Sequence, residues 1–256
     1  MALLVCQPPR VVGILGGMGP AAGADFVRLF VGACTQLMSA AGVPVTDQAY
    51  PEHWLAQVPV PDRSTALRAG QMPQRPLEAM KQVAARLGAL GARTLAIACN
   101  TAHAWHGALQ ESFPDLDVIH GVRETALAIA RSGERDAGLL ATQGTYDSRL
   151  YDVALGQAGV RCHVPAPAER AALMEGIYSG VKAGNLALAQ DRFTSVAKSL
   201  AARHGCSTIV LGCTEIPLAL TPGPGTEGLT LVDPALAMAR ALALRAYGAD
   251  PAFAWD

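Results

Sequence analysis

The chain has 256 residues, of which 51% are hydrophobic and 16% charged, and its formal net charge is −1. This composition predicts a folded globular protein with one large or two small domains and excludes a disordered chain. The balanced charge argues against a nucleic-acid surface or an electrostatic membrane anchor, so the expected partner is a small molecule. Residues 1–10 lack the pattern of a signal peptide and no apolar run reaches membrane-spanning length, which predicts a cytoplasmic location.

Regular structure is expected to start with a strand over 11–15, a glycine turn over 16–19 and a helix that opens at Pro20, a residue suited to the first helical position. Apolar periodicity then predicts alternating elements. The expected helices are 77–90, 101–112, 123–131, 146–157, 186–204 and 233–247, and the expected strands are 93–98, 118–120, 137–141, 160–164 and 208–211. Alternation of this kind predicts an α/β fold with parallel sheets and helices on both faces.

An internal repeat divides the chain. Cys99 and Cys213 each stand where an apolar run meets a polar segment, with Gly eight residues and Thr five residues earlier in both copies. Residues 13–20 likewise align with 138–145, where a strand again runs into a turn. The repeat predicts two similar lobes, each a parallel sheet flanked by helices, related by a pseudo-twofold axis with the active site between them.

The domain boundaries follow from this repeat. We expect a first lobe of residues 1–120 with 228–256, the latter carrying a helix that returns to it, and a second lobe of residues 121–227.

The two repeated corners favour thiol chemistry. A cysteine between the end of a strand and the start of a helix faces unpaired N–H groups and the positive end of the helix dipole, which stabilise the thiolate. Because an ordinary cysteine is mostly protonated at neutral pH, a lowered pKa in one thiol would let it act as a base while the other acts as an acid. Burial for packing is the alternative for either cysteine.

The remaining cysteines carry no polar motif and are predicted to be structural: Cys6, Cys34, Cys162 and Cys206. No CxxC pair or zinc-type histidine spacing occurs, so neither a metal site nor a disulfide framework is expected. The glycines near residue 16 also do not spell a dinucleotide or phosphate-binding motif.

Five motifs, in order along nearly the whole chain, resemble the aspartate/glutamate racemase family, and most closely its aspartate racemase branch. The resemblance implies racemisation of an acidic amino acid by the two cysteines without a cofactor, in a two-lobed α/β fold that is often a homodimer. The motifs are Gly-Gly-Met-Gly-Pro at 16–20, Pro-Asp-Arg-Ser at 61–64, Cys-Asn-Thr-Ala-His at 99–103, Lys-Ala-Gly at 182–184 and Leu-Gly-Cys-Thr-Glu-Ile-Pro at 211–217.

Racemisation without a cofactor needs a base and an acid on opposite faces of Cα, with fixed donors that stabilise the planar intermediate. Cys99 and Cys213 fit the first two roles. Arg63 matches a family arginine and is suited to hold a carboxylate through two hydrogen bonds, and Lys182 is similar to a family lysine near the side-chain carboxylate. The other expected substrate-binding residues are Met18, Gly19, Asn100, Thr101, Thr142, Thr145, Thr214 and Glu215.

Several alternatives stay open. Helix capping or turn formation explains the polar residues equally well, solvated surface charge explains Arg63 and Lys182, and His103 either tunes Cys99 or only packs. Residues 57–63 lack the Asn-Pro pair of aspartate racemases, which leaves glutamate or a broader amino-acid range as substrate. Hydantoin racemases, maleate isomerases and arylmalonate decarboxylases use related corners, and a non-catalytic amino-acid-binding protein would not need both thiols.

Overall fold

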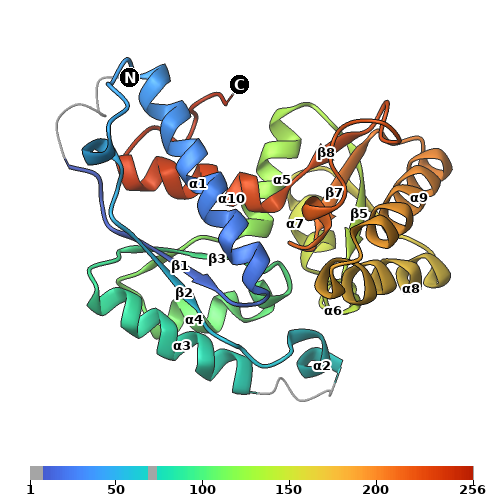
Figure 1. Cartoon of the computed structure of the whole chain (residues 1–256), viewed down its shortest axis with the longest axis horizontal. Coiled ribbons are helices and arrows are strands. Elements are labelled where there is room, and N and C mark those ends of the chain that lie inside the picture. Colours follow the sequence, from blue (N-terminus) through green and yellow to red (C-terminus); the bar gives the residue numbers. More distant parts are fainter. Residues whose placement is uncertain (1–7, 69–73, 256) are drawn as a thin grey trace.

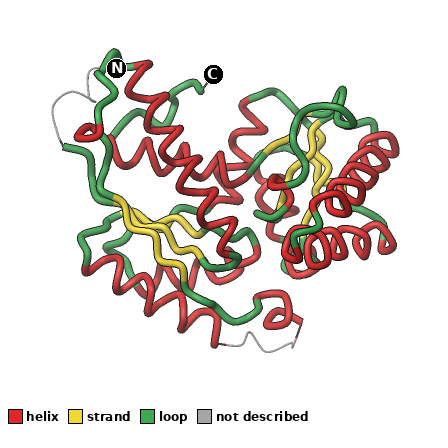
Figure 2. The backbone as a smooth tube through the Cα atoms, viewed as in Figure 1, coloured by secondary structure: helices red, strands yellow, loops and turns green. Residues whose placement is uncertain are grey.

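The computed structural model describes residues 8–68 and 74–255. It contains two separate four-stranded sheets, and every strand pair in both sheets is parallel. Helices flank each sheet, so two lobes lie side by side (Figure 1), and their strands form two separate groups in space (Figure 2). The predicted two-lobed α/β fold is confirmed. None of the described helices is both long and apolar enough to cross a membrane.

The first sheet has the strand order β2-β1-β3-β4. Its strands are β1 Val12–Gly16, β2 His53–Gln57, β3 Thr94–Ile97 and β4 Asp117–Val118. Its helices are α1 Pro20–Ala40, α2 Arg63–Arg68, α3 Gln74–Ala89 and α4 His106–Ser112, which follows a 3-10 turn over Thr101–Trp105.

The second sheet repeats this pattern with the order β6-β5-β7-β8. Its strands are β5 Asp136–Ala141, β6 Arg161–His163, β7 Thr208–Gly212 and β8 Thr230–Val232. The helices after the first lobe are α5 Gly121–Arg131, α6 Gln143–Asp147, α7 Leu150–Gln157, α8 Pro167–Glu175, α9 Leu186–His204 and α10 Pro234–Tyr247.

The register of the strands confirms that the two halves repeat. Val12 pairs with Thr94 in the first sheet, and Ala137 pairs with Thr208 in the second, as the alignment of 13–20 with 138–145 requires. The next residue in each central strand is a glycine, because a Cβ there would lie 2.5 Å from a Leu95 methyl at Gly13 and 2.8 Å from an Ile209 methyl at Gly138. Equivalent positions therefore meet the same packing constraint.

Helix α10 crosses back from the second lobe to the first. Asp233 caps it by accepting from the Ala235 N–H at 2.8 Å, Pro234 occupies the first turn, and Gly248 ends it with φ 63°. Its apolar face packs on α1 in a core cluster that includes Phe30 and Leu242. The Arg10 N–H also donates to Ala246 O at 2.8 Å, so the end of α10 lies beside the segment that leads into β1.

The structure also differs from the expected elements. Within the segment 228–256, β8 pairs with β7 of the second sheet, whereas α10 packs on α1 of the first lobe. The helix expected over 146–157 is interrupted at Arg149, whose φ is 52°. The elements β2, α2, α8 and β8 were not expected. β2 is a partly exposed edge strand without a buried apolar run, and α2 is too short to show a helical period.

Candidate active site

Cys99 and Cys213 face one small cavity between the carboxyl ends of the two sheets. Cys99 follows β3 and Cys213 directly follows β7, and each is 6% exposed. The cavity measures about 30 Å³. Its lining comes from both lobes and comprises Met18, Asp62, Arg63, Ser64, Cys99, Asn100, Thr101, Thr142, Ile177, Tyr178, Lys182, Cys213, Thr214 and Glu215.

Two of the expected site residues lie just behind this lining. Gly19 caps α1, and a Cβ there would lie 3.2 Å from Glu215 Oε1. Thr145 is 1% exposed, and its hydroxyl lies 3.0 Å from that of Thr101. All the other predicted site residues thus line the cavity. Gly19 and Thr145 lie against lining residues, Gly19 against Glu215 and Thr145 against Thr101.

A chain of polar contacts surrounds Cys213. Its thiol donates to Glu215 Oε2 at 3.0 Å, and the Thr214 hydroxyl donates to the same oxygen at 3.2 Å. The other carboxylate oxygen lies 3.0 Å from Lys182 Nζ. Burial and then the Glu215 charge raise the pKa of Cys213 well above its ordinary value, and Glu215 raises the pKa of Lys182 although burial lowers it. Cys213 is therefore a protonated thiol beside an ion pair.

The helix start expected after each cysteine is absent at Cys213. After the cysteine the chain forms only the short 3-10 turn Ile216–Leu218, followed by the proline- and glycine-rich residues 221–225, so no helix dipole acts on the sulfur. A carboxylate two residues away acts instead, in the opposite direction. A 3-10 turn and α4 do follow Cys99, so the two corners differ in the structure behind the cysteine.

Arg63 approaches the cavity from the start of α2. Its Nη1 donates to Val60 O at 3.0 Å and to Pro61 O at 3.2 Å, and its Nη2 donates to Met18 O at 2.9 Å. Its Nε is buried and finds no hydrogen-bond partner within the described residues. Burial lowers the pKa of Arg63, but the nearby Cys99, Asp62 and Glu215 raise it above its ordinary value.

Hydrogen bonds join the two lobes next to Cys99. The hydroxyl of Thr101, in the first lobe, lies 3.0 Å from those of Thr142 and Thr145 in the second. The Tyr151 hydroxyl of α7 donates to Asn100 Oδ1 at 2.6 Å. Thr142 also caps α6, so capping and a place in the cavity wall coincide at this residue. These contacts place the residues after Cys99 against the second lobe.

Sequence reasoning missed four lining residues and one supporting residue. Asp62 and Ser64 flank Arg63 in the Pro-Asp-Arg-Ser motif, so this motif could have identified them. Ile177 and Tyr178 lie in a π-helical turn over Gly176–Gly180, and Tyr151 contributes through a tertiary contact. No local pattern distinguishes these three from core residues.

Other cysteines lie away from the cavity. Cys34 and Cys206 are buried and Cys162 is partly buried, and burial raises the pKa of each thiol, to about 12 for Cys34 and Cys162. Cys6 is outside the described residues.

Most of the chain is similar to a known protein family. The profile of the Asp/Glu/Hydantoin racemase family matches residues 15–242. The structure is similar to the Picrophilus torridus aspartate racemase, with a TM-score of 0.75 and 25% identity over 93% of this chain and 94% of that one.

Two curated relatives match part of the sequence. The glutamate racemase of Pseudomonas putida (strain W619) is 34% identical over 170 residues, covering 63% of this chain and 61% of the relative. The broad specificity amino-acid racemase RacX of Bacillus subtilis (strain 168) is 28% identical over 151 residues, covering 57% and 60%. The chain thus spans less than two thirds of either relative. Since the family profile covers most of its length, the chain belongs to the Asp/Glu/hydantoin racemase family.

Proposed function

We propose that this chain interconverts the L and D forms of aspartate or glutamate by two-base proton transfer between Cys99 and Cys213, without a cofactor. One observation carries the proposal: equivalent cysteines of the two repeats face one cavity that also holds Arg63 and Lys182. Membership of the racemase family supports an isomerase.

The raised pKa of Cys213 fits the acid of an acid–base pair on opposite sides of a substrate. In one direction of racemisation Cys213 starts as the protonated thiol, and we assign Cys99 as the thiolate base that takes the Cα proton. When Cys213 then gives its proton to the other face of Cα, it becomes a thiolate and Cys99 is left protonated. The reverse direction starts from that state. Lys182, held 3.0 Å from Glu215, keeps a positive charge close to the thiolate formed at Cys213.

The two cationic side chains, Arg63 and Lys182, fit a substrate that carries two carboxylates. In Arg63 the unpartnered Nε and the Nη2 group form one edge of the guanidinium, which can hold both oxygens of a carboxylate. Lys182 has three N–H donors, and Glu215 uses one of them. We assign the α-carboxylate and the side-chain carboxylate to these two groups, with Asn100, Thr101, Thr142 and Thr214 as further donors from the cavity wall.

The cavity must enlarge for such a substrate to bind. A volume of about 30 Å³ holds two or three water molecules, because each needs roughly 10–15 Å³. The segments that close it carry Arg63 on one side and Lys182 on the other. We therefore propose that α2 and the turn over Val181–Ala183 move apart to admit the amino acid and close on its carboxylates. A homodimer, a cytoplasmic location and the division into two domains stay predictions.

The test is α-proton exchange in deuterated water under reducing conditions, followed by NMR. The panel contains both enantiomers of aspartate, glutamate and alanine, together with a substituted hydantoin. We expect exchange and racemisation of aspartate or glutamate and none with alanine or the hydantoin. Exchange of the hydantoin alone would assign the chain to another branch of its family. Binding of acidic amino acids without exchange would make it a binding protein and overturn the proposal.

A further inference from the structure

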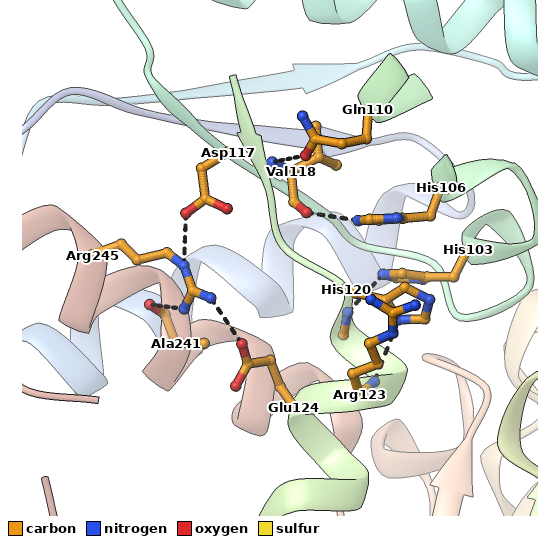
Figure 3. A network of polar contacts seen from close by, with 11 residues as sticks. His103, His106, Gln110, Asp117, Val118, His120, Arg123, Glu124, Ala241 and Arg245 are labelled. Atoms are coloured by element: carbon orange, nitrogen blue, oxygen red, sulfur yellow. Dashed lines mark hydrogen bonds and ion pairs between the residues drawn. The ribbon is translucent and has the colours of Figure 1, made fainter. Parts of the chain in front are cut away.

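His103 is a buried histidine that lies behind the cavity wall and touches two distant parts of the chain. It is 3% exposed and stands on the 3-10 turn that follows Cys99. Its Nδ1 lies 2.9 Å from Cys99 O and 3.2 Å from Asn100 O, and its Nε2 lies 3.0 Å from the backbone N of Gly121. The ring therefore joins the first thiol corner to the start of α5. Figure 3 shows the ring beside His120.

Only one protonation state of this ring satisfies its partners. The N–H of Gly121 can only donate, so Nε2 must be unprotonated, and the carbonyls of Cys99 and Asn100 can only accept, so Nδ1 must carry the proton. Burial and the neighbouring His106 lower the pKa of His103 to about 4. At neutral pH the imidazole is thus a fixed neutral donor, and it has no part in proton transfer.

Packing leaves this ring little freedom. A Cβ at Gly121 would lie 3.2 Å from His103 Nε2 and 2.9 Å from Met238 Sδ of α10. The start of α5 therefore approaches the ring as closely as a glycine allows. The carbonyls that the ring holds belong to Cys99 itself and to the next residue.

We propose that His103 is a positioning residue for Cys99: its Nδ1–H fixes the peptide groups that carry the thiol, and its Nε2 anchors them to the start of α5. Its effect on rate rests on the proposed racemase function, whereas its effect on the position of Cys99 does not. A thiol displaced by about 1 Å from its reactive geometry is expected to lose on the order of 100-fold in rate.

Two substitutions separate the hydrogen bonds of the ring. His103→Asn keeps an N–H donor near the position of Nδ1, and His103→Gln keeps an acceptor near Nε2 but loses the donor to Cys99 O. We expect His103→Gln to lower kcat for racemisation by about 100-fold and His103→Asn to retain most of it, with KM little changed in both. His106→Gln is the matched control, since its amide can still donate to Val118 O, the partner of His106 Nε2.

A readout independent of activity uses protein labelled with 13C at the cysteine Cβ. The Cys99 resonance should move in His103→Gln and stay near its wild-type position in His103→Asn, while Cys213 stays unchanged in both. Equal losses of kcat in the two variants would show that the ring acts only through packing. An unmoved Cys99 resonance in His103→Gln would overturn the proposal at any level of activity. A shift of the Cys99 resonance in His103→Gln, in a protein that exchanges the α-proton of no amino acid, would support the positioning role and refute the racemase function.

Gly121→Ala provides a second variant if His103→Gln does not fold. The added methyl group removes no polar group and is compatible with a helix. It contacts both Met238 and the His103 ring. The flexible Met238 side chain can move aside, whereas the hydrogen-bonded ring cannot do so without disturbing its contacts to Cys99 and Asn100. We expect the Cys99 resonance to move and that of Cys213 to stay. An unchanged Cys99 resonance in this variant contradicts the proposal.

Discussion

At the scale of single residues, the two cavity cysteines differ more than their matched sequences suggest. Cys213 shares its proton with Glu215, which is itself paired with Lys182, whereas Cys99 lies beside the guanidinium of Arg63. Local sequence identified both thiols. Glu215 stands two residues after Cys213 in the same motif, whereas Lys182 and Arg63 come from segments far away along the chain and were expected only from the family resemblance.

The Glu215 carboxylate is expected to set the proton affinity of Cys213. In Glu215→Gln the negative charge beside the sulfur is lost, so the pKa of Cys213 should fall toward its ordinary value. The pH dependence of Cys213 alkylation by iodoacetamide, followed by peptide mass spectrometry, measures this change. Asp62→Asn removes a charge from the same cavity without a bond to Cys213 and should move the alkylation midpoint less. An unmoved or raised midpoint in Glu215→Gln would show that burial alone controls this thiol.

Arg63 should depend on its planar fork as well as on its charge. Arg63→Lys keeps a cation but cannot hold a carboxylate through two parallel bonds, so kcat/KM for the acidic substrate should fall roughly 10- to 100-fold, about 1.4–3 kcal/mol. Steady-state kinetics compares it with Arg68→Lys on the same helix, which should behave as wild type. Full efficiency in Arg63→Lys would remove this residue from the substrate site.

At the scale of elements, the buried strands were predictable, whereas the strands β2 and β8 and the segments after the strands were not. Buried runs such as β1 and β7 show clearly in the sequence. The helix predicted after Cys99 exists, whereas the corner at Cys213 continues into Pro217 and a proline- and glycine-rich segment that cannot extend a helix. Equivalent corners therefore need not have equivalent helices behind them.

The central strands should respond alike to an added methyl group. Gly138→Ala places a Cβ 2.8 Å from side-chain carbons of Leu200 and Ile209, and Gly13→Ala creates the same conflict with Leu95. Each should lower the free energy of unfolding by about 1–3 kcal/mol in urea denaturation. Gly32→Ala on α1 has nothing within 4 Å and should stabilise by about 0.5–1 kcal/mol. A neutral effect at either strand glycine would contradict the packing described.

The start of α5 should make the protein sensitive to acid. Burial, with His103 and His106 nearby, lowers the pKa of His120 to about 3, and burial lowers that of His103 to about 4. Unfolded histidines take up protons near pH 6.5, so the stabilisation from the neutral rings is complete above that pH and is lost as the pH falls toward 4 and 3. For the buried His103 this amounts to about 3 kcal/mol, and for the partly exposed His120 screening reduces it to about 1–2 kcal/mol.

His120→Asn tests this account because asparagine can replace the ring as cap of α5, where His120 Nδ1 accepts from the Arg123 N–H. The variant should unfold with a shallower pH dependence between 6.5 and 4 while matching wild type at pH 7.5. Urea denaturation at a series of pH values measures this. An equal slope in the two proteins would show that His120 is already solvated in the folded state.

At the scale of the whole molecule, the duplication was the most informative feature of the sequence. It predicted two parallel sheets, and the matching registers explain why both cysteines arrive at equivalent strand ends. The bonds between the lobes, from Thr101 to Thr142 and from Tyr151 to Asn100, could not be predicted, since they depend on how two folded units meet. They hold the lobes together around a cavity too small for an amino acid, so substrate binding is expected to involve motion.

The central claim is that each thiol serves one face of Cα, and enantiomer-specific exchange in single-cysteine variants tests it most directly. Cys99→Ser and Cys213→Ser should stay folded, lose racemisation, and each wash the α-proton out of only one enantiomer of the acidic substrate, with opposite preferences, because serine is far too weak an acid to replace a thiol. Cys162→Ser, outside the cavity, should exchange both enantiomers as wild type does. Racemisation at the wild-type rate in either folded cavity variant would contradict the paired-thiol mechanism.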